Sequence, residues 1–150
     1  MREILFKGKR IDNGEWIEGN LVFLFPKKVH EAFIIPIKFG NAFMQLREGD
    51  LGFRCWYKVD KETLCQFTGL CDKNGNKIWE NDIFQYTDET MVTQKDLIEY
   101  NETHASFVRL HNTEKLGLQY LWIDEATCNH GEVIGNIFDN KELLQEKSDE

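Results

Sequence analysis

Residues 59–84, VDKETLCQFTGLCDKNGNKIWENDIF, are the most informative stretch of this chain. The stretch reads as strand, tight turn and strand, with the strands predicted at 66–70 and 77–86. Asp72 at the start of the turn can accept hydrogen bonds from turn amides, and Gly75 supplies the positive φ that such a turn needs. The stretch therefore predicts a β-hairpin in the middle of the sequence.

A second hairpin is predicted near the N-terminus. Apolar and polar residues alternate over 4–9, which indicates a first strand. Asn13 and Gly14 tolerate the positive φ of a tight turn, and residues 15–25 then read as the return strand, which ends at Pro26. The two hairpins match at a constant offset, in which Asn13, Gly14, Ile17, Asn20 and Phe23 correspond to Asn74, Gly75, Ile78, Asn81 and Phe84. We interpret this match as shared hairpin chemistry rather than as an internal repeat.

Further short strands are predicted on both sides of the central hairpin. Residues 32–37 are apolar, but Pro36 cannot donate to a ladder, so an edge strand or a bulge is expected there. The other predicted strands are 43–46 and 53–59, which flank a turn at 48–50, then a hairpin of 106–111 and 118–123, and a last strand at 133–138.

Two segments depart from this β pattern. Residues 87–103 are polar and acidic with no clean period, so we expect an exposed acidic excursion with a short helix around 94–100. Asp139 and Glu142 have the spacing of a capping box, which predicts a short helix that carries Leu143 and Leu144.

Many short strands joined by Asn-Gly turns predict a mainly β fold. The expected architecture is a small barrel or a coiled antiparallel sheet built from hairpins, with a short C-terminal helix. At 150 residues and without a Gly/Ser-rich linker, residues 1–150 are expected to form a single domain.

Charge is unevenly distributed along the chain, which carries −8 in total. Residues 85–150 hold 5 Lys and Arg against 14 Asp and Glu, a net of −9. This acidic half repels phosphate backbones and argues against general nucleic-acid binding. The N-terminus lacks the apolar core of a signal peptide, and the longest apolar run, 21–25, is too short to cross a bilayer. We expect a cytoplasmic protein with no membrane partner and with reduced cysteines.

Nucleophilic catalysis finds little support in the sequence. Ser106 and Ser148 are the only serines, and neither lies in a Gly-x-Ser-x-Gly turn. No Gly-rich phosphate loop is present. Cys128 and His130 are close in sequence, but on one strand they would merely share a face. A structural cysteine beside a loop histidine is therefore the preferred interpretation.

A zinc site would need about four ligands at tight paired spacing. Cys65 and Cys71 are too far apart for a zinc knuckle, and they flank an apolar strand. A composite site with Cys128 and His130 is the weaker alternative. The other histidines, which are His30, His104 and His111, show no ligand spacing. We expect no metal and no cofactor.

The best enzyme candidates are carboxylates. Glu80 and Asp82 are two residues apart, so in a strand both project from one face, and Asp72 would approach them across the hairpin. Paired carboxylates can bind Mg²⁺ or divide the roles of acid and base. The stronger alternative is that these acidic residues bind backbone amides or face water.

Basic and aromatic residues suggest two kinds of surface. The basic cluster could contact phosphates, or its lysines could protect an edge strand from aggregation, which we prefer. Its members are Lys7, Lys9, Arg10, Lys27 and Lys28. Core packing is the default for the four tryptophans, whereas an exposed one would mark a partner surface. They are Trp16, Trp56, Trp79 and Trp122.

Three blocks of this sequence, in order, resemble the YopX family of phage and prophage proteins. The specific block is 59–84, and the weaker ones are 6–19 and 132–144. The resemblance implies a small, mainly β protein of phage or prophage origin with no established activity. The chain departs from the family where Cys65 and Asn81 replace the usual Gly. The motif residues are Gly8, Asn13, Gly14, Trp16, Gly19, Gln66, Thr68, Gly69, Asp72, Gly75, Glu80, Asp82, Ile134, Gly135 and Asn136.

The expected function is therefore a non-catalytic interaction or self-assembling module in the bacterial cytoplasm, which binds a protein partner or itself. One alternative is a metal-assisted hydrolase that uses Glu80 and Asp82. The other is nucleic-acid binding through the N-terminal basic cluster. The first alternative requires Glu80 and Asp82 to project from one strand face, and the second requires the cations of the basic cluster to contact phosphates.

Overall fold

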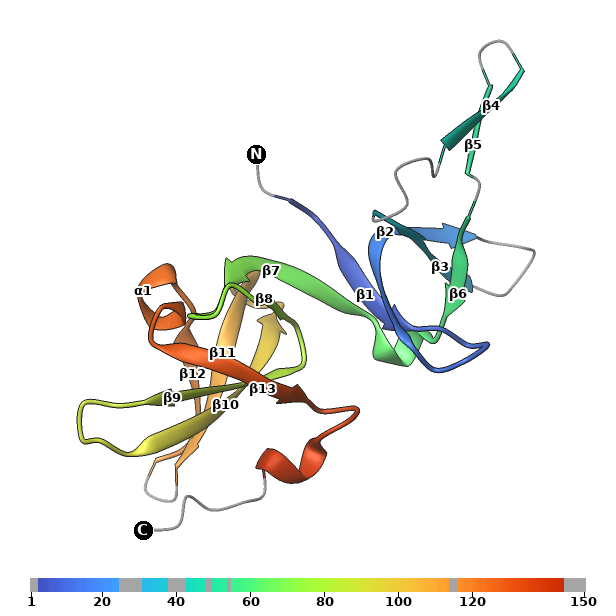
Figure 1. The fold of residues 1–150 in the computed structure, drawn as a ribbon. Coiled ribbons are helices and arrows are strands. Elements are labelled where there is room, and N and C mark those ends of the chain that lie inside the picture. Colours follow the sequence, from blue (N-terminus) through green and yellow to red (C-terminus); the bar gives the residue numbers. More distant parts are fainter. Residues whose placement is uncertain are drawn as a thin grey trace. The chain divides into compact units, whose positions relative to one another are not determined.

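The structure is a computed structural model. It describes residues 3–24, 31–37, 43–47, 50–53, 55–113 and 116–144, with the backbone alone described at 43–47 and 50–53. The chain divides into two compact units, unit 1 (Met1–Gln66) and unit 2 (Phe67–Glu150), and strands dominate both (Figure 1). The single domain expected over residues 1–150 stays a prediction.

Unit 1 is an antiparallel sheet with the strand order β6-β3-β2-β1-β7. The predicted N-terminal hairpin is present, with Gly14 at φ 74° in its turn. Ala32, Ile34 and Val59 form the buried core, with Ile17 and Leu21 packed against it. The elements are β1 (Phe6–Lys9), β2 (Trp16–Leu24), β3 (Glu31–Pro36), β6 (Tyr57–Val59), the 3₁₀ turn η1 (Lys61–Thr63) and the start of β7 (Cys65–Cys71).

Two further strands of unit 1, β4 (Phe43–Arg47) and β5 (Asp50–Phe53), form a separate two-stranded hairpin. The turn predicted at 48–50 falls mostly on residues 48–49, which lie outside the described residues. Phe25, where the second predicted strand was expected to end, also lies outside them.

The edge strand predicted at Pro36 is wrong. β3 pairs with β2 on one side and with β6 on the other, so it is an inner strand. Pro36 is tolerated because it is the last residue of β3 and pairs only with Gly19 of β2, beyond the residues that pair with β6. Its missing N–H therefore breaks no bond of the β3–β6 ladder.

Unit 2 contains an open five-stranded antiparallel sheet with the strand order β12-β11-β10-β9-β13. The end of β7 also pairs with β8. Ile78, Phe84, Ile98 and Cys128 form the buried core. The elements that follow β7 are β8 (Lys77–Trp79), β9 (Asp82–Thr87), β10 (Thr93–Asn101), β11 (Ser106–Thr113), β12 (Gly117–Trp122), the single-turn helix α1 (Glu125–Cys128), β13 (Gly131–Asn136) and the 3₁₀ turn η2 (Lys141–Leu144).

The mainly β fold class is confirmed, and the hairpin of β11 and β12 and the last strand β13 lie where the sequence predicted them. The barrel is not confirmed, because the described strands of unit 2 form an open sheet with β12 and β13 at its two edges. The predicted C-terminal helix is a single 3₁₀ turn, η2, and α1, capped by the Asp124 side chain, was missed.

The helix predicted around 94–100 is wrong. This segment lies in β10, the central strand of the sheet, and both Asp96 and Ile98 are fully buried. The exposed parts of the predicted acidic excursion are thus the turns on either side of β10, at 88–92 and from 102 onward. The segment appeared aperiodic because one of its inward residues is a charged aspartate, whose partners, Arg109 and His111, come from the next strand.

The strand predicted at 77–86 is interrupted. Lys77–Trp79 pairs with β7, whereas Asp82–Thr87 belongs to the five-stranded sheet. Glu80 and Asn81 form the turn between them, and Asn81 has a φ of 67°. A residue in this left-handed conformation ends the extended backbone, which explains the break.

No helix in the described part of the chain is long and apolar enough to cross a membrane.

Candidate interaction surface

Asp72, the first residue of the central turn, is buried and fully engaged by backbone amides. Its Oδ1 accepts from the N–H groups of Asn74 and Asn76 at 2.9 and 2.8 Å, and its Oδ2 accepts from the N–H of Val133 at 3.1 Å. Burial acts to raise the pKa of Asp72, but these hydrogen bonds outweigh it and the pKa is lowered. Asp72 therefore has a structural role, because it holds the backbone of its own turn and of β13 in place.

The predicted pair of Glu80 and Asp82 does not form on one strand face. The prediction required an extended strand through residues 80–82, in which side chains alternate between the two faces. The backbone instead turns at Glu80 and Asn81, so this alternation is lost. Asp82 is buried, and its Oδ2 accepts the backbone N–H of Trp79 at 2.8 Å, which closes this turn. The carboxylate face predicted from the spacing is thus wrong, because the backbone turns between the two residues.

The motif residues of the central block occupy turns and a bulge. Gly75 has a φ of 81° in the hairpin turn, and Gly69 has a φ of 91° where the register of β7 and β8 shifts. Thr68 is buried beside Gly69, and its Oγ1 donates to the carbonyl of Ile78 at 2.8 Å. Gln66 pairs with Phe6 of β1.

The N-terminal motif residues form the first hairpin and its close contacts. Asn13 Oδ1 accepts the backbone N–H of Glu15 at 3.0 Å in the turn. A Cβ at Gly19 would lie 2.0 Å from the carbonyl oxygen of Ile35, so only glycine fits between these strands. Gly8 is less constrained, with its nearest side-chain neighbour at 3.2 Å.

The C-terminal motif residues lie at an irregularity of β13. Its register with β9 shifts between Val133 and Gly135, at Ile134. A Cβ at Gly135 would lie 2.5 Å from Oδ1 of Asn140. Asn136 Oδ1 accepts the backbone N–H groups of Phe138 and Asp139, both at 3.0 Å. Ile134, Gly135 and Asn136 therefore shape the end of the strand.

The described part of the N-terminal basic cluster lies over aromatic rings. The Nζ atoms of Lys7 and Lys9 lie 5.1 and 5.4 Å from the Trp16 ring centroid. Arg10 lies 4.1 Å from the Tyr57 ring centroid and donates two hydrogen bonds to Asp12. Lys27 and Lys28 lie outside the described residues. The described cations thus have intramolecular contacts, which a phosphate would have to compete with.

The cysteines are free thiols, and Cys128 is not paired with His130. Cys128 is buried, and this burial raises the pKa of its thiol to about 11. His130 donates from Nδ1 to the carbonyl of Ala126 at 2.7 Å, within the α1 turn. Among the described residues, no group of three or more His, Cys, Asp or Glu side chains is arranged to hold a metal ion.

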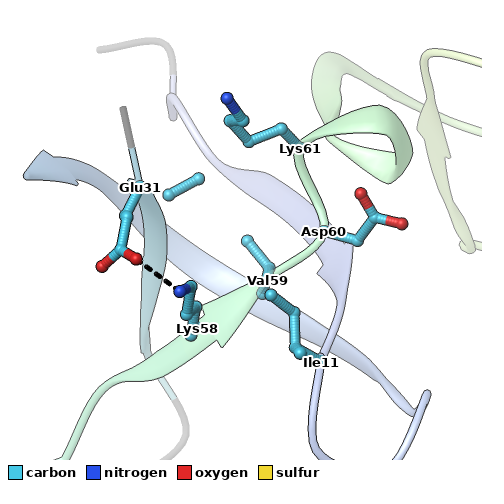
Figure 2. Close-up of a pocket in the computed structure, with 7 residues that line it drawn as sticks. Ile11, Glu31, Lys58, Val59, Asp60 and Lys61 are labelled. Atoms are coloured by element: carbon cyan, nitrogen blue, oxygen red, sulfur yellow. Dashed lines mark hydrogen bonds and ion pairs between the residues drawn. The ribbon is translucent and has the colours of Figure 1, made fainter. Parts of the chain in front are cut away.

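A shallow hollow lies beside β6 and η1 in unit 1 (Figure 2). Ala32 and Val59 supply its apolar floor, and Lys58 at its rim donates to Glu31 at 2.5 Å. Asp60, also at the rim, accepts the backbone N–H of Glu62 and caps η1. The charged groups of Glu31, Lys58 and Asp60 are therefore used by the fold.

Sequence reasoning missed a buried polar cluster in unit 2. Asp96 accepts from Nη1 of Arg109 at 2.9 Å, and its other oxygen lies 2.7 Å from Nδ1 of His111. The guanidinium of Arg109 also lies 4.8 Å from the ring centroid of Tyr86. Burial beside Asp96 raises the pKa of Tyr86. Arg109 and His111 are two residues apart in a predicted strand, so their side chains share one face. This spacing was the sequence signal from which the cluster could have been predicted.

The most exposed apolar row in unit 2 lies on β12, the edge strand of its sheet. The row comprises Leu118, Tyr120 and Trp122, which are 57%, 57% and 67% exposed. The register with β11 places Tyr120 opposite Leu110 and Trp122 opposite Val108, so all five side chains share one face. We call Leu118, Tyr120 and Trp122 the β12 row.

The β12 row is the exposed end of a face that is buried further inside the sheet. Tyr120 pairs with Leu110, Leu110 with Leu97, and Leu97 with Ile83, which is fully buried. Of the four tryptophans, Trp79 is buried and Trp16 is half-buried, whereas Trp122 and Trp56 are exposed. Only Trp122 belongs to a row of exposed apolar neighbours on a regular strand.

Comparisons with known proteins give two findings. A family model described as YopX protein matches residues 39–145. The crystal structure of protein EF1440 from Enterococcus faecalis is similar in fold, with a TM-score of 0.57 and 23% identity over 96% of this chain and 99% of that chain. No curated protein sequence matches.

Proposed function

The chain belongs to the YopX family, and we propose that it is a non-catalytic protein-binding module of phage or prophage origin that acts in the bacterial cytoplasm. The β12 row is the proposed binding surface. The observation that carries the proposal is the exposure of Trp122 and Tyr120 side by side on an edge strand.

Aromatic exposure of this kind is characteristic of protein interfaces. Trp and Tyr are enriched among the residues that dominate binding energy, because each buries a large area and loses little conformational entropy. An exposed strand edge also offers unpaired backbone groups to a partner. The β12 row provides both features in one place.

The carboxylates considered for catalysis support the same proposal. Asp72 and Asp82 are buried, and their oxygens accept hydrogen bonds from backbone amides of the same chain. A metal ion or a substrate there would have to displace bonds that hold the turns together. Glu80 lies in the turn and does not extend a strand face with Asp82.

An affinity pull-down from bacterial lysate, with and without nuclease, tests the proposal. The wild-type chain is expected to retain a nuclease-resistant protein, and Trp122→Lys is expected to lose it, because a charge would have to be buried at the interface. Trp56→Lys is the matched control, since Trp56 is also exposed, at 55%, but lies in unit 1.

Two results would contradict the proposal. One is retention of the same partner by Trp122→Lys, and the other is a partner that disappears with nuclease. The phage origin is tested separately by the genomic position of the gene, and the cytoplasmic site of action by fractionation of cells that express the natural gene.

A further inference from the structure

We propose that the β12 row binds a second copy of this chain, with β12 of one copy pairing antiparallel to β12 of the other about a two-fold axis. The inference rests on the proposed function, because it names the partner of the same surface. The two copies would join their five-stranded sheets edge to edge.

The first argument comes from the contrast between the two edges of the sheet. At β13, the outward backbone groups are covered by the turn that follows β7, because Lys73 donates its N–H to Gly131 O at 3.0 Å and Asp72 accepts from Val133 N. β13 also carries a bulge and a charged residue, Glu132. Covering segments, bulges and charges are the usual protections of a sheet edge against pairing.

β12 shows none of these protections over its described length. Its sequence, GLQYLW, contains no charged residue and no proline, and it pairs with β11 through six consecutive positions without a bulge. Its other side has no neighbour in the sheet among the described strands. A regular, uncharged, apolar edge is the form that accepts another strand.

The second argument is that β12 is complementary to itself. If two copies pair with Tyr120 opposite Tyr120, then Leu118 of each copy lies opposite Trp122 of the other. Directly opposed residues of antiparallel strands share a face, so every exposed side chain of the β12 row meets an apolar partner. Isologous contacts of this kind close as dimers and do not propagate into fibres.

The net charge of each copy determines how the affinity of the dimer depends on salt. Each copy carries −8, so two copies repel one another at long range. In the proposed register no charged residue of β12 faces another, and Asp124 lies opposite Leu116, outside the strand pair. Screening by salt therefore strengthens the dimer, whereas it would weaken the binding of a basic partner.

The surface area buried between the two copies limits the affinity of the dimer. Fully covered Tyr and Trp side chains bury roughly 150–250 Å² each, and in β12 they are 57% and 67% exposed. Even with the backbone and Leu118 added, the area stays below the roughly 800 Å² per partner of a standard interface. The dimer is therefore concentration-dependent, with a dissociation constant on the order of 0.1 mM.

Sedimentation equilibrium of the purified chain, from about 10 µM to about 1 mM, tests the inference. Wild type is expected to shift from monomer to dimer, and to do so at lower concentration when salt is added. Tyr120→Lys is expected to raise the dissociation constant by about tenfold or more, because it places like charges opposite each other. Met91→Lys, at an exposed turn residue of the same unit, is the control.

Cross-linking tests the register independently of affinity. Tyr120→Cys is expected to form a disulfide between copies on mild oxidation, because each Cys meets its own symmetry mate. Thr90→Cys, exposed in the turn before β10, is expected to remain uncross-linked. Cys71 is exposed and is replaced by Ser in both variants.

A wild type that is monomeric at all these concentrations, with no Tyr120→Cys cross-link, would overturn the inference. So would a dimer that Tyr120→Lys leaves unchanged. The proposed function is judged separately: loss of a lysate protein from Trp122→Lys would support it even if the chain proves monomeric. Circular dichroism of each variant verifies that the substitution leaves the fold intact.

Discussion

The Asp72 carboxylate accepts a hydrogen bond of 3.1 Å from the backbone N–H of Val133, 61 residues further along the chain. The same carboxylate accepts from Asn74 and Asn76 within its own turn. One side chain thus shapes the central hairpin and attaches it to the outer edge of β13. This arrangement accounts for a buried aspartate without any catalytic role.

Asp72→Asn is expected to reduce the free energy of unfolding by about 2–4 kcal/mol, because an amide nitrogen would face backbone donors that now bind a carboxylate oxygen. Urea denaturation measures the change. Asp88→Asn is the control, since Asp88 accepts from Thr90 and Val92 in an exposed turn and a smaller loss is expected there. Equal losses of unfolding free energy for the two variants would show that the buried hydrogen bonds of Asp72 contribute no more than those of an exposed turn.

The stability of the protein is expected to fall with pH in acid, partly through Asp72. Its pKa is lowered in the folded state, so it contributes stability above the pKa of the unfolded chain, and that stability is lost as the pH falls through the folded value. Asp72→Asn removes this titration. The difference in unfolding free energy between wild type and variant should therefore shrink at acidic pH, as followed by urea denaturation at several pH values.

Asp96→Ala is expected to cost about 3–5 kcal/mol of stability, because it leaves the buried guanidinium of Arg109 without its anion. The double variant Asp96→Leu with Arg109→Met is expected to recover most of that loss, since it removes both charges. The single variants Asp96→Leu and Arg109→Met complete a double-mutant cycle, and urea denaturation of the four proteins gives the coupling free energy. A double variant less stable than Asp96→Ala would contradict the argument.

Asn81→Gly is expected to be tolerated, with a change in stability within about 1 kcal/mol, because glycine adopts the φ of 67° found there at no steric cost. Asn81→Val is expected to lose about 1–3 kcal/mol, since a β-branched residue is strained in this conformation. Thermal unfolding of the two variants side by side measures the difference. Equal stability of the two would mean that the turn relaxes to another conformation.

Cys128 is expected to resist alkylation in the folded protein, whereas the exposed Cys71 reacts. Its pKa of about 11 keeps the thiol protonated near neutral pH. The raised pKa also means that its contribution to stability is present below the unfolded pKa and is lost as the pH rises toward about 11. Mass spectrometry after iodoacetamide treatment, with and without denaturant, measures both thiols. Rapid labelling of folded Cys128 would contradict its burial.

Local turn chemistry was the part of the fold that the sequence could predict. Asn13, Gly14, Asp72 and Gly75 act on residues close to them in sequence, so their turns are where the pattern placed them. The family motif pointed to the same hairpins. Neither indicates which strands pair at long range, and so β3 was mistaken for an edge strand.

The errors arose where a residue's role depends on a distant partner. Asp96 looked like a solvent-facing acid until β11 supplied Arg109 and His111. Asn81 broke a strand whose hydrophobic pattern appeared continuous. The exposure of Trp122 depends on β12 lying at the end of the sheet, a fact of topology that composition and spacing do not contain.

The place of β13 in the sheet also governs how the chain emerges from the ribosome. β9, β10, β11 and β12 are synthesised in the order in which they pair, but β13 follows all four and covers the free side of β9. Until residues 131–136 have been translated, β9 is an unprotected edge and Asp72 lacks the Val133 amide. A chain that terminates before Gly131 is therefore prone to aggregation, because β9 then lacks the strand that covers it.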